Sequence, residues 1–245
     1  MVKIATQEIT LQVSDGTSMN AYAAHPEAPG KVPGMLVLQE AFGVNAHIRD
    51  ITERMAREGY VAIAPELFHR TASGFEGTYD NFPAVMPHIQ ALTEAGQAAD
   101  IRAAYDWLRA NRQVSADRVA SIGFCMGGRA SFLADALLPL QASISFYGGG
   151  IAQALLPRAK DLHAPILLFW GGLDHHITQE HTRAVEDALK AAEKPYVNVT
   201  VSYADHGFFC DARASYNPAA AGLAWKLTLQ FLDTYVKGTA ATAHA

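Results

Sequence analysis

A cysteine framed by glycines is the sharpest chemical feature of the sequence. Cys125 stands in Gly123-Phe124-Cys125-Met126-Gly127-Gly128, after the apolar run Val119–Ile122 and before a stretch with a helical pattern. This spacing is typical of a nucleophile elbow, a strained strand-to-helix turn that leaves no room for side chains at the flanking glycines. The N-terminus of the following helix favours a thiolate. The pattern therefore predicts that Cys125 is a nucleophile rather than a small buried hydrophobe.

A cysteine nucleophile needs a base, and the base needs an acid that orients it. Asp174 follows the apolar run Leu167–Trp170, and His206 follows Val199–Tyr203. Loops at the carboxyl ends of parallel strands meet at one crevice, and nucleophile, acid and histidine occur here in the chain order of a known class of triad. We therefore predict a triad of Cys125, Asp174 and His206. Asp205 is an alternative acid, but a residue adjacent to the histidine rarely reaches its ring, which favours a turn role.

Glu40 also requires an explanation, because it directly follows the apolar run Leu36–Leu38 and Gln39. A carboxylate at the end of a buried strand is costly unless it is paired. The loop after this strand supplies one N–H of an oxyanion hole, and the residue after the nucleophile supplies the other. This predicts the backbone N–H groups of Ala41 and Met126 as donors. Glu40 could hydrogen-bond the thiol of Cys125, or it could be held by backbone N–H groups alone.

Several histidines near Asp174 raise the question of a metal centre. His175, His176 and His181 lie close to Glu180 in the sequence. Their spacing matches no zinc motif on a helix, and adjacent histidines point in different directions in most backbone conformations. The sequence therefore predicts no metal ligands in this segment.

The elements that position these residues alternate between short apolar runs and amphipathic stretches. Gln7–Val13 and Met19–Ala24 alternate apolar and polar residues around Ser14-Asp15-Gly16, which predicts an antiparallel hairpin. Later runs are continuously apolar, as in parallel strands covered on both faces; they are Met35–Leu38, Tyr60–Ala64, Val119–Phe124, Ala142–Tyr147 and Ile166–Trp170. Helices are predicted around Ile48–Arg57 and over Gly96–Asn111, Met126–Leu138, Thr178–Ala192 and Pro218–Val236.

This alternation predicts an α/β protein with a mostly parallel central sheet, an N-terminal antiparallel hairpin and helices on both faces. We expect one domain over residues 1–245, with a frayed tail at 239–245. The segment Phe68–Gly96 interrupts the pattern with two prolines and has no Lys or Arg between Arg70 and Arg102. We expect this excursion to be a lid or substrate loop, or a variable surface insertion.

Composition excludes several classes of protein. The 245 residues are 50% hydrophobic and 18% charged, with a formal net charge of −5. A disordered chain is less hydrophobic, and a nucleic-acid-binding protein needs a clustered basic face. We therefore expect neither disorder nor a nucleic-acid partner. No apolar run is long enough to span a membrane, and Met1–Thr10 lacks a secretory h-region, so we expect a cytoplasmic protein that does not bind membranes.

The quoted motifs closely resemble those of the dienelactone hydrolase family, which has the α/β-hydrolase fold. The matching motifs, in the family's order, are Gln39–Asn45, Gly59-Tyr60 with Ala64–Leu67, Gly123–Gly128, Tyr147-Gly148, Gly172–Asp174 and His206–Phe208. The resemblance implies a triad of Cys125, His206 and Asp174, with Glu40 exchanging a hydrogen bond or proton with the thiol. It also implies hydrolysis of an activated enol-lactone or ester, a small-molecule substrate, without metal or organic cofactor.

The substrate is where the sequence departs from the family. Members that act on dienelactone hold its carboxylate with an arginine from the excursion and another shortly after the catalytic histidine. Here residues 71–101 contain no arginine, and the nearest one after His206 is Arg213. Arg213, or Arg70 from elsewhere, could serve, so neutral esters are as compatible as dienelactone. Phe42, Tyr147 and Arg213 are our candidates for contact with substrate. The oligomeric state is left open.

Two other functions remain open from the sequence. A thiol-based peroxide sensor would use Cys125 with Cys210 as the resolving thiol, although Cys210 has no glycine frame and is interpreted as a packing residue. A catalytically silent binding protein on the same fold is the other, because a fold alone does not fix function.

Overall fold

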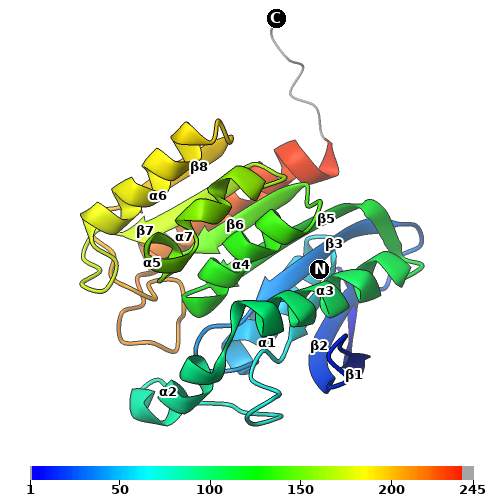
Figure 1. Cartoon of the computed structure of the whole chain (residues 1–245). Coiled ribbons are helices and arrows are strands. Elements are labelled where there is room, and N and C mark those ends of the chain that lie inside the picture. Colours follow the sequence, from blue (N-terminus) through cyan, green and yellow to red (C-terminus); the bar gives the residue numbers. More distant parts are fainter. Residues whose placement is uncertain (1, 239–245) are drawn as a thin grey trace, which may run out of the picture.

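One eight-stranded sheet runs through the computed structural model, which describes residues 2–238 (Figure 1). Its strand order is β1-β2-β4-β3-β5-β6-β7-β8. The strands are β1 (Ile4–Gln12), β2 (Ser18–Pro26), β3 (Val32–Leu38), β4 (Val61–Pro65), β5 (Val114–Phe124), β6 (Ala142–Phe146), β7 (Ile166–Gly171) and β8 (Tyr196–Val201). Strands β1 and β2 form an antiparallel hairpin, β2 pairs antiparallel with β4, and the pairings from β4 to β8 are parallel.

Helices cover the sheet on both sides, with α3, α4 and α6 in front and α7 behind in Figure 1. The helical segments are α1 (Ala46–Arg57), α2 (Phe82–Ala91), α3 (Glu94–Ala110), α4 (Met126–Leu137), α5 (Ile151–Ala154), a 3-10 turn (Leu156–Asp161), α6 (Gln179–Ala191), α7 (Pro218–Leu232) and a π-helical turn (Asp233–Lys237). The predicted α/β fold with its N-terminal hairpin is confirmed. The predicted tail at 239–245 lies outside the described residues.

Burial explains why the central strands are apolar throughout. Every residue of β4, β6 and β7 is buried, because helices pack on both faces of these strands. Strands β1 and β8, at the two edges of the sheet, retain exposed positions. The carboxyl ends of β3, β5, β7 and β8 therefore come from a rigid, packed core, and the loops that follow them carry the candidate catalytic residues.

The excursion after β4 contains a helix that the sequence reading missed. Pro83 occupies the first turn of α2, where a missing N–H costs nothing, and Pro87 lies inside the helix. The excursion is tied to the loop after β3, because the N–H of Gly77 donates to the carbonyl of Phe42 at 3.1 Å. It therefore packs beside the loop that carries Glu40. None of the helices in the described part of the chain is long and apolar enough to cross a bilayer.

Candidate active site

Cys125 lies at a strained turn between β5 and α4. Its backbone has φ 55° and ψ −116°, a left-handed conformation that is uncommon for residues other than glycine. The N–H of Cys125 donates to the carbonyl of Phe146 at 3.0 Å, which anchors the turn to β6. The side chain is partly exposed at the N-terminus of α4. The strand–turn–helix geometry expected of a nucleophile elbow is therefore present.

The glycines around Cys125 are required by close backbone contacts. A Cβ atom on Gly123 would collide with the carbonyl oxygen of Gly127, and a Cβ atom on Gly127 would collide with the carbonyl oxygen of Leu38. The second contact joins α4 to the end of β3. The turn can therefore close only without side chains at these positions.

Asp174 and His206 meet beyond the ends of β7 and β8. The Nδ1 atom of His206 lies 2.7 Å from Oδ2 of Asp174, and Nδ1 must carry the proton because a carboxylate can only accept. The other oxygen of Asp174 accepts from the N–H groups of His176 and Ile177 at 2.7 and 2.9 Å. Burial opposes ionisation of Asp174, but its bonds to His206 and these backbone groups lower its pKa. The carboxylate is thereby fixed in position and ionised.

The contacts of His206 favour its charged form. Burial disfavours the imidazolium, but the hydrogen bonds of His206 with Asp174 and with the side chain of Cys125 raise its pKa to about 10. The structure thus brings the three residues of the predicted triad together. The alternative acid, Asp205, accepts instead from the backbone N–H of His206 at 2.6 Å.

Two backbone N–H groups at the predicted oxyanion hole have no partner. Within residues 2–238, the N–H groups of Ala41 and Met126 donate to no other protein group. Both residues are at least 95% buried, and an unpaired buried amide is costly. The contact between Gly127 and the end of β3 brings the two segments together. These N–H groups are therefore available to a ligand oxygen.

Glu40 is fully buried, and both of its oxygens are engaged. Arg213 donates from Nη1 to Oε1 at 3.1 Å, and the hydroxyl of Tyr79 donates to Oε2 at 3.1 Å. Tyr79 in turn accepts from the side chains of Asn45 at 3.0 Å and Cys210 at 3.2 Å. The predicted hydrogen bond between Glu40 and the thiol of Cys125 stays a prediction, since Cys125 contacts His206 in this arrangement.

A cleft of about 290 Å³ opens in front of His206. Its lining consists of Tyr79, His175, His176, Asp205, His206, Arg213, Ala214 and Ser215. Of the candidate substrate-contact residues, Arg213 alone lines this cleft. Tyr147 is fully buried and packs against the ring of His206 at a centroid distance of 5.1 Å, and Phe42 is 2% exposed. Their contact with substrate therefore stays a prediction.

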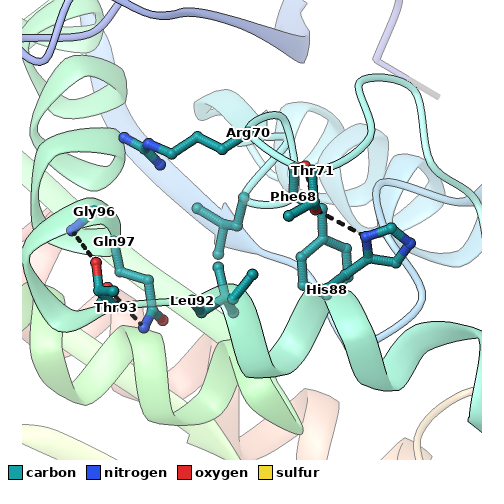
Figure 2. Close-up of a pocket in the computed structure, with 10 residues that line it drawn as sticks. Phe68, Arg70, Thr71, His88, Leu92, Thr93, Gly96 and Gln97 are labelled. Atoms are coloured by element: carbon teal, nitrogen blue, oxygen red, sulfur yellow. Dashed lines mark hydrogen bonds between the residues drawn. The ribbon is translucent and has the colours of Figure 1, made fainter.

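Other candidates lie away from this cleft. Arg70 is bound to Asp100 and Asp15 at the base of the excursion. It lines a separate cavity of about 20 Å³, which Figure 2 shows between the excursion and α3. His181 accepts from the backbone N–H of Thr178 at 3.3 Å, at the start of α6. Arg70 is therefore not placed to meet a ligand in the cleft.

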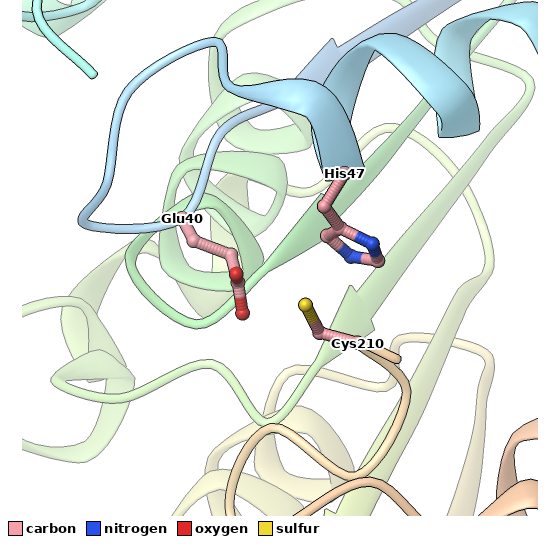
Figure 3. Close-up of side chains that lie close together, drawn as sticks. All are labelled: Glu40, His47 and Cys210. Atoms are coloured by element: carbon pink, nitrogen blue, oxygen red, sulfur yellow. The ribbon is translucent and has the colours of Figure 1, made fainter. Parts of the chain in front are cut away.

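Sequence reasoning missed two residues that surround Glu40. Tyr79 comes from the excursion, and His47 comes from the first turn of α1. Figure 3 shows Glu40, His47 and Cys210 turned toward one another. No spacing rule joins these residues, because they come from three distant segments. The available signal in the sequence was Glu40 itself, a carboxylate at the end of a buried strand that needs hydrogen-bond partners.

The comparisons with known proteins agree with this geometry. The model of the Dienelactone hydrolase family matches residues 19–236. The chain belongs to the dienelactone hydrolase family. It is 36% identical to a Synechocystis sp. protein named "Putative carboxymethylenebutenolidase", over 96% of this chain and 99% of the relative. It is 28% identical to a Bradyrhizobium sp. protein named "Probable 2-oxo-3-(5-oxofuran-2-ylidene)propanoate lactonase", over 96% and 98%.

A solved structure extends the match. The crystal structure titled "Putative Dienelactone Hydrolase" from Klebsiella pneumoniae has a TM-score of 0.87 and 34% identity, covering 95% of this chain and all of the other. The resemblance to the dienelactone hydrolase family and the predicted ester or lactone hydrolase class are confirmed. As a member of this family, the chain is a hydrolase that acts on ester or lactone bonds of small molecules.

Proposed function

We propose that this dienelactone hydrolase family member cleaves enol-lactones or activated esters with Cys125 as the nucleophile. The observation that supports it most directly is the left-handed backbone of Cys125 beside a His206–Asp174 pair whose Nδ1–Oδ2 distance is 2.7 Å. A backbone strained in this way persists only where the surrounding structure holds it, and such strain is concentrated at functional sites.

In the proposed mechanism, the proton of Cys125 passes to Nε2 of His206, and the thiolate attacks the carbonyl carbon. The N–H groups of Ala41 and Met126 bind the oxyanion. Collapse of the tetrahedral species breaks the C–O bond, His206 gives its proton to the leaving oxygen, and an acyl-thioester remains. Neutral His206 then takes a proton from water as the water attacks the thioester. The C–S bond breaks, the carboxylic acid product leaves, and His206 returns the proton to the sulfur of Cys125, while Asp174 stabilises the imidazolium in both half-reactions.

The leaving group limits the substrate. A thiolate is a better leaving group than an alkoxide, so the tetrahedral species from a simple alkyl ester would expel Cys125 again. An enolate or phenolate leaves the tetrahedral species more readily than an alkoxide does, and it can compete with the thiolate of Cys125 as the leaving group. This supports enol-lactones and aryl esters as substrates. Arg213 at the cleft supplies a positive charge for a substrate carboxylate, such as the propanoate in the name of the Bradyrhizobium relative.

Replacement of the nucleophile is the first test. We expect Cys125→Ala to lower kcat/KM for p-nitrophenyl acetate at least about 10³-fold, because no other group replaces the attacking sulfur. Cys210→Ala is the matched control and should retain most of the activity, since Cys210 has no part in the mechanism. Equal losses in the two variants, or retention of wild-type turnover in Cys125→Ala, would refute the assignment.

The intermediate provides a second test. Rapid acid quenching with a slowly hydrolysed aryl ester should leave one acyl group on the peptide that contains Cys125, detected by mass spectrometry. Modification elsewhere would contradict the acyl-thioester.

A third test concerns the charge of the substrate. A panel that pairs each neutral ester with its carboxylated analogue would show whether Arg213 selects anions, and Arg213→Gln is the variant that should remove the preference.

The burial of Cys210 counts against the peroxide-sensor alternative. Its side chain is fully buried, and burial together with the nearby charge of Glu40 raises the pKa of the thiol to about 11. A resolving cysteine needs an accessible thiolate. We therefore retain hydrolysis as the proposed function.

A further inference from the structure

Glu40, His47 and Cys210 form a buried cluster that the proposed mechanism does not use as a unit. One ligand-capable atom from each side chain lies within 4.8 Å of the other two. Figure 3 shows the three side chains converging from the loop after β3, the start of α1 and the loop after His206. The set offers one oxygen, one nitrogen and one sulfur donor, a combination that suits Zn²⁺ among common divalent ions.

His47 supplies an independent sign of a missing ligand. Only 6% of the surface of His47 is exposed, and its Nε2 atom has no hydrogen-bond partner among the described residues. The ring packs edge-on against Phe124 at a centroid distance of 5.6 Å, so water has little access. A buried polar atom of this kind is costly unless something binds it.

We propose that Glu40, His47 and Cys210 bind Zn²⁺ beside the active site. The ion would take Oε2 of Glu40, while Arg213 keeps its bond to Oε1. Cys210 would lose its thiol proton to solvent and bind as a thiolate. The negative charges on Glu40 and Cys210 offset that of the ion, and with Arg213 the site carries a net charge of +1. An imidazole nitrogen and a water molecule complete four-fold coordination.

Tyr79 controls access to this zinc site. Its hydroxyl bridges Glu40 and Cys210 at 3.1 and 3.2 Å, so it holds the ligands together without metal. Tyr79 also lines the cleft, which places it between solvent and the cluster. Entry of the ion therefore requires the hydroxyl of Tyr79 to move aside, and Zn²⁺ takes over its two partners.

The test must separate this site from the triad, because Cys125 with His206 could also bind a metal. All proteins therefore carry Cys125→Ala and are freed of metal with a chelator. Calorimetric titration with Zn²⁺ should show one ion per chain. Titration with Co²⁺ should produce thiolate-to-metal charge-transfer absorption, which in this background can come from Cys210 alone.

Adding Cys210→Ala should abolish the charge-transfer absorption and weaken binding of Zn²⁺ at least about tenfold. His47→Gln should weaken binding similarly and is the second variant if Cys210→Ala fails to fold, as judged by circular dichroism. His176→Gln, in the cleft, is the matched control and should leave binding unchanged. Absence of the absorption in Cys125→Ala, or sensitivity to His176→Gln with indifference to Cys210→Ala, would overturn the proposal.

Discussion

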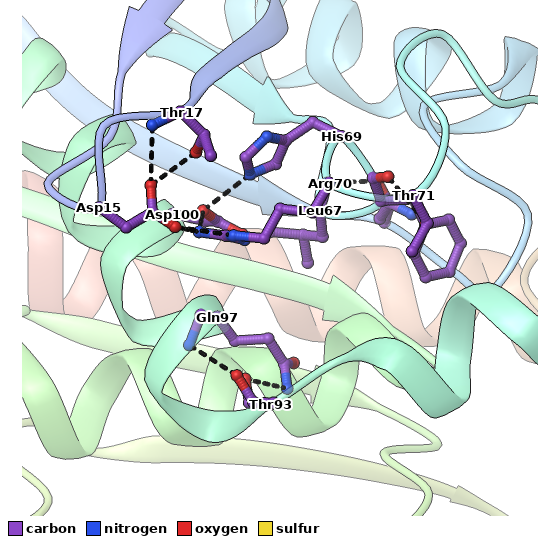
Figure 4. A network of polar contacts seen from close by, with 12 residues as sticks. Asp15, Thr17, Leu67, His69, Arg70, Thr71, Thr93, Gln97 and Asp100 are labelled. Atoms are coloured by element: carbon purple, nitrogen blue, oxygen red, sulfur yellow. Dashed lines mark hydrogen bonds and ion pairs between the residues drawn. The ribbon is translucent and has the colours of Figure 1, made fainter.

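Two buried carboxylates in this protein pair with arginine, and they do so differently. Asp100 receives two bonds from the guanidinium of Arg70, at 2.7 and 2.8 Å, and a third contact from Nε2 of His69 at 3.0 Å. Figure 4 shows this network extending to Asp15 in the N-terminal hairpin. Glu40 receives a single bond from Arg213, at 3.1 Å. The Asp100–Arg70 pair is therefore held by two hydrogen bonds and is saturated, whereas the Glu40–Arg213 pair is held by one and is freer to exchange partners.

The difference follows from position. Asp100 lies in α3, where it joins the base of the excursion to the hairpin. Glu40 lies at the carboxyl end of β3, where Arg213 and Tyr79 both line the cleft. A two-pronged arginine–carboxylate pair is geometrically specific and hard to rearrange. We infer that the Asp100 pair serves stability and that the looser Glu40 pair serves the reaction.

The largest effect should come from breaking the saturated pair. Asp100→Ala leaves Arg70 and the buried ring of His69 without their shared acceptor, and loss of one partner from a buried pair costs about 3–5 kcal/mol. Urea unfolding should show this loss, while kcat/KM of the remaining folded protein stays near that of the wild type. A loss of activity without a loss of stability would reverse the roles that we assign to the two pairs.

Glu40→Gln should show the opposite pattern. If Glu40 exchanges a hydrogen bond or proton with the thiol, as we propose, kcat/KM for p-nitrophenyl acetate should fall about 100-fold, which corresponds to about 2.7 kcal/mol. The amide retains the shape of the side chain and an acceptor for Arg213 but loses the charge, so the free energy of unfolding should fall by about 1–3 kcal/mol, less than in Asp100→Ala. Steady-state kinetics and urea unfolding of the same preparation provide the comparison, and a purely structural Glu40 would leave the rate unchanged.

A third buried carboxylate shows what happens without an arginine. Asp135 accepts from the backbone N–H groups of His163 and Ala164 and from Ser143, and within residues 2–238 no arginine bonds to it. Burial outweighs these bonds and raises its pKa from 3.8 to about 6. A carboxyl whose pKa is higher in the folded state gives stability that is complete below its unfolded pKa and is lost as pH rises through 6.

Asp135→Asn removes this titration. Between pH 4 and pH 7, wild-type stability should therefore fall by about 2 kcal/mol relative to the variant. Thermal unfolding of both proteins across this range measures the difference. Parallel pH profiles would mean that Asp135 is ionised without penalty, and that arginine is not what distinguishes the other two carboxylates.

The smallest effect should come from Tyr79→Phe. The change removes the hydroxyl that bonds to Glu40, Asn45 and Cys210 but keeps the ring, so unfolding should become easier by about 1 kcal/mol. Tyr22→Phe removes a hydroxyl on β2 of the hairpin that donates to Glu53 of α1, and it is a control for loss of a hydrogen bond away from the cleft. A change in kcat/KM confined to Tyr79→Phe would tie the hydroxyl to Glu40, whereas equal kinetics in both variants would limit Tyr79 to packing.

The sequence predicted the parts of this site that depend on regular structure. Cys125, Asp174 and His206 each follow a buried strand, and the sheet then determines where they meet. The surroundings of Glu40 could not be predicted in this way. Tyr79 reaches Glu40 only because of the path of the excursion, and that path includes a helix hidden by Pro83 and Pro87. Irregular segments have no periodicity from which a contact could be inferred.

The turn that carries Cys125 also determines at what stage of folding its thiol comes to lie beside His206. The turn packs against the carbonyl oxygens of Leu38 and Gln39, more than eighty positions earlier in the chain, through the bare backbone of Gly127. Until β3 and β5 lie side by side, nothing holds Cys125 in its left-handed conformation or brings His206 to it. In a nascent or unfolded chain the thiol of Cys125 is therefore an ordinary cysteine thiol, and it becomes a reactive nucleophile only as folding is completed.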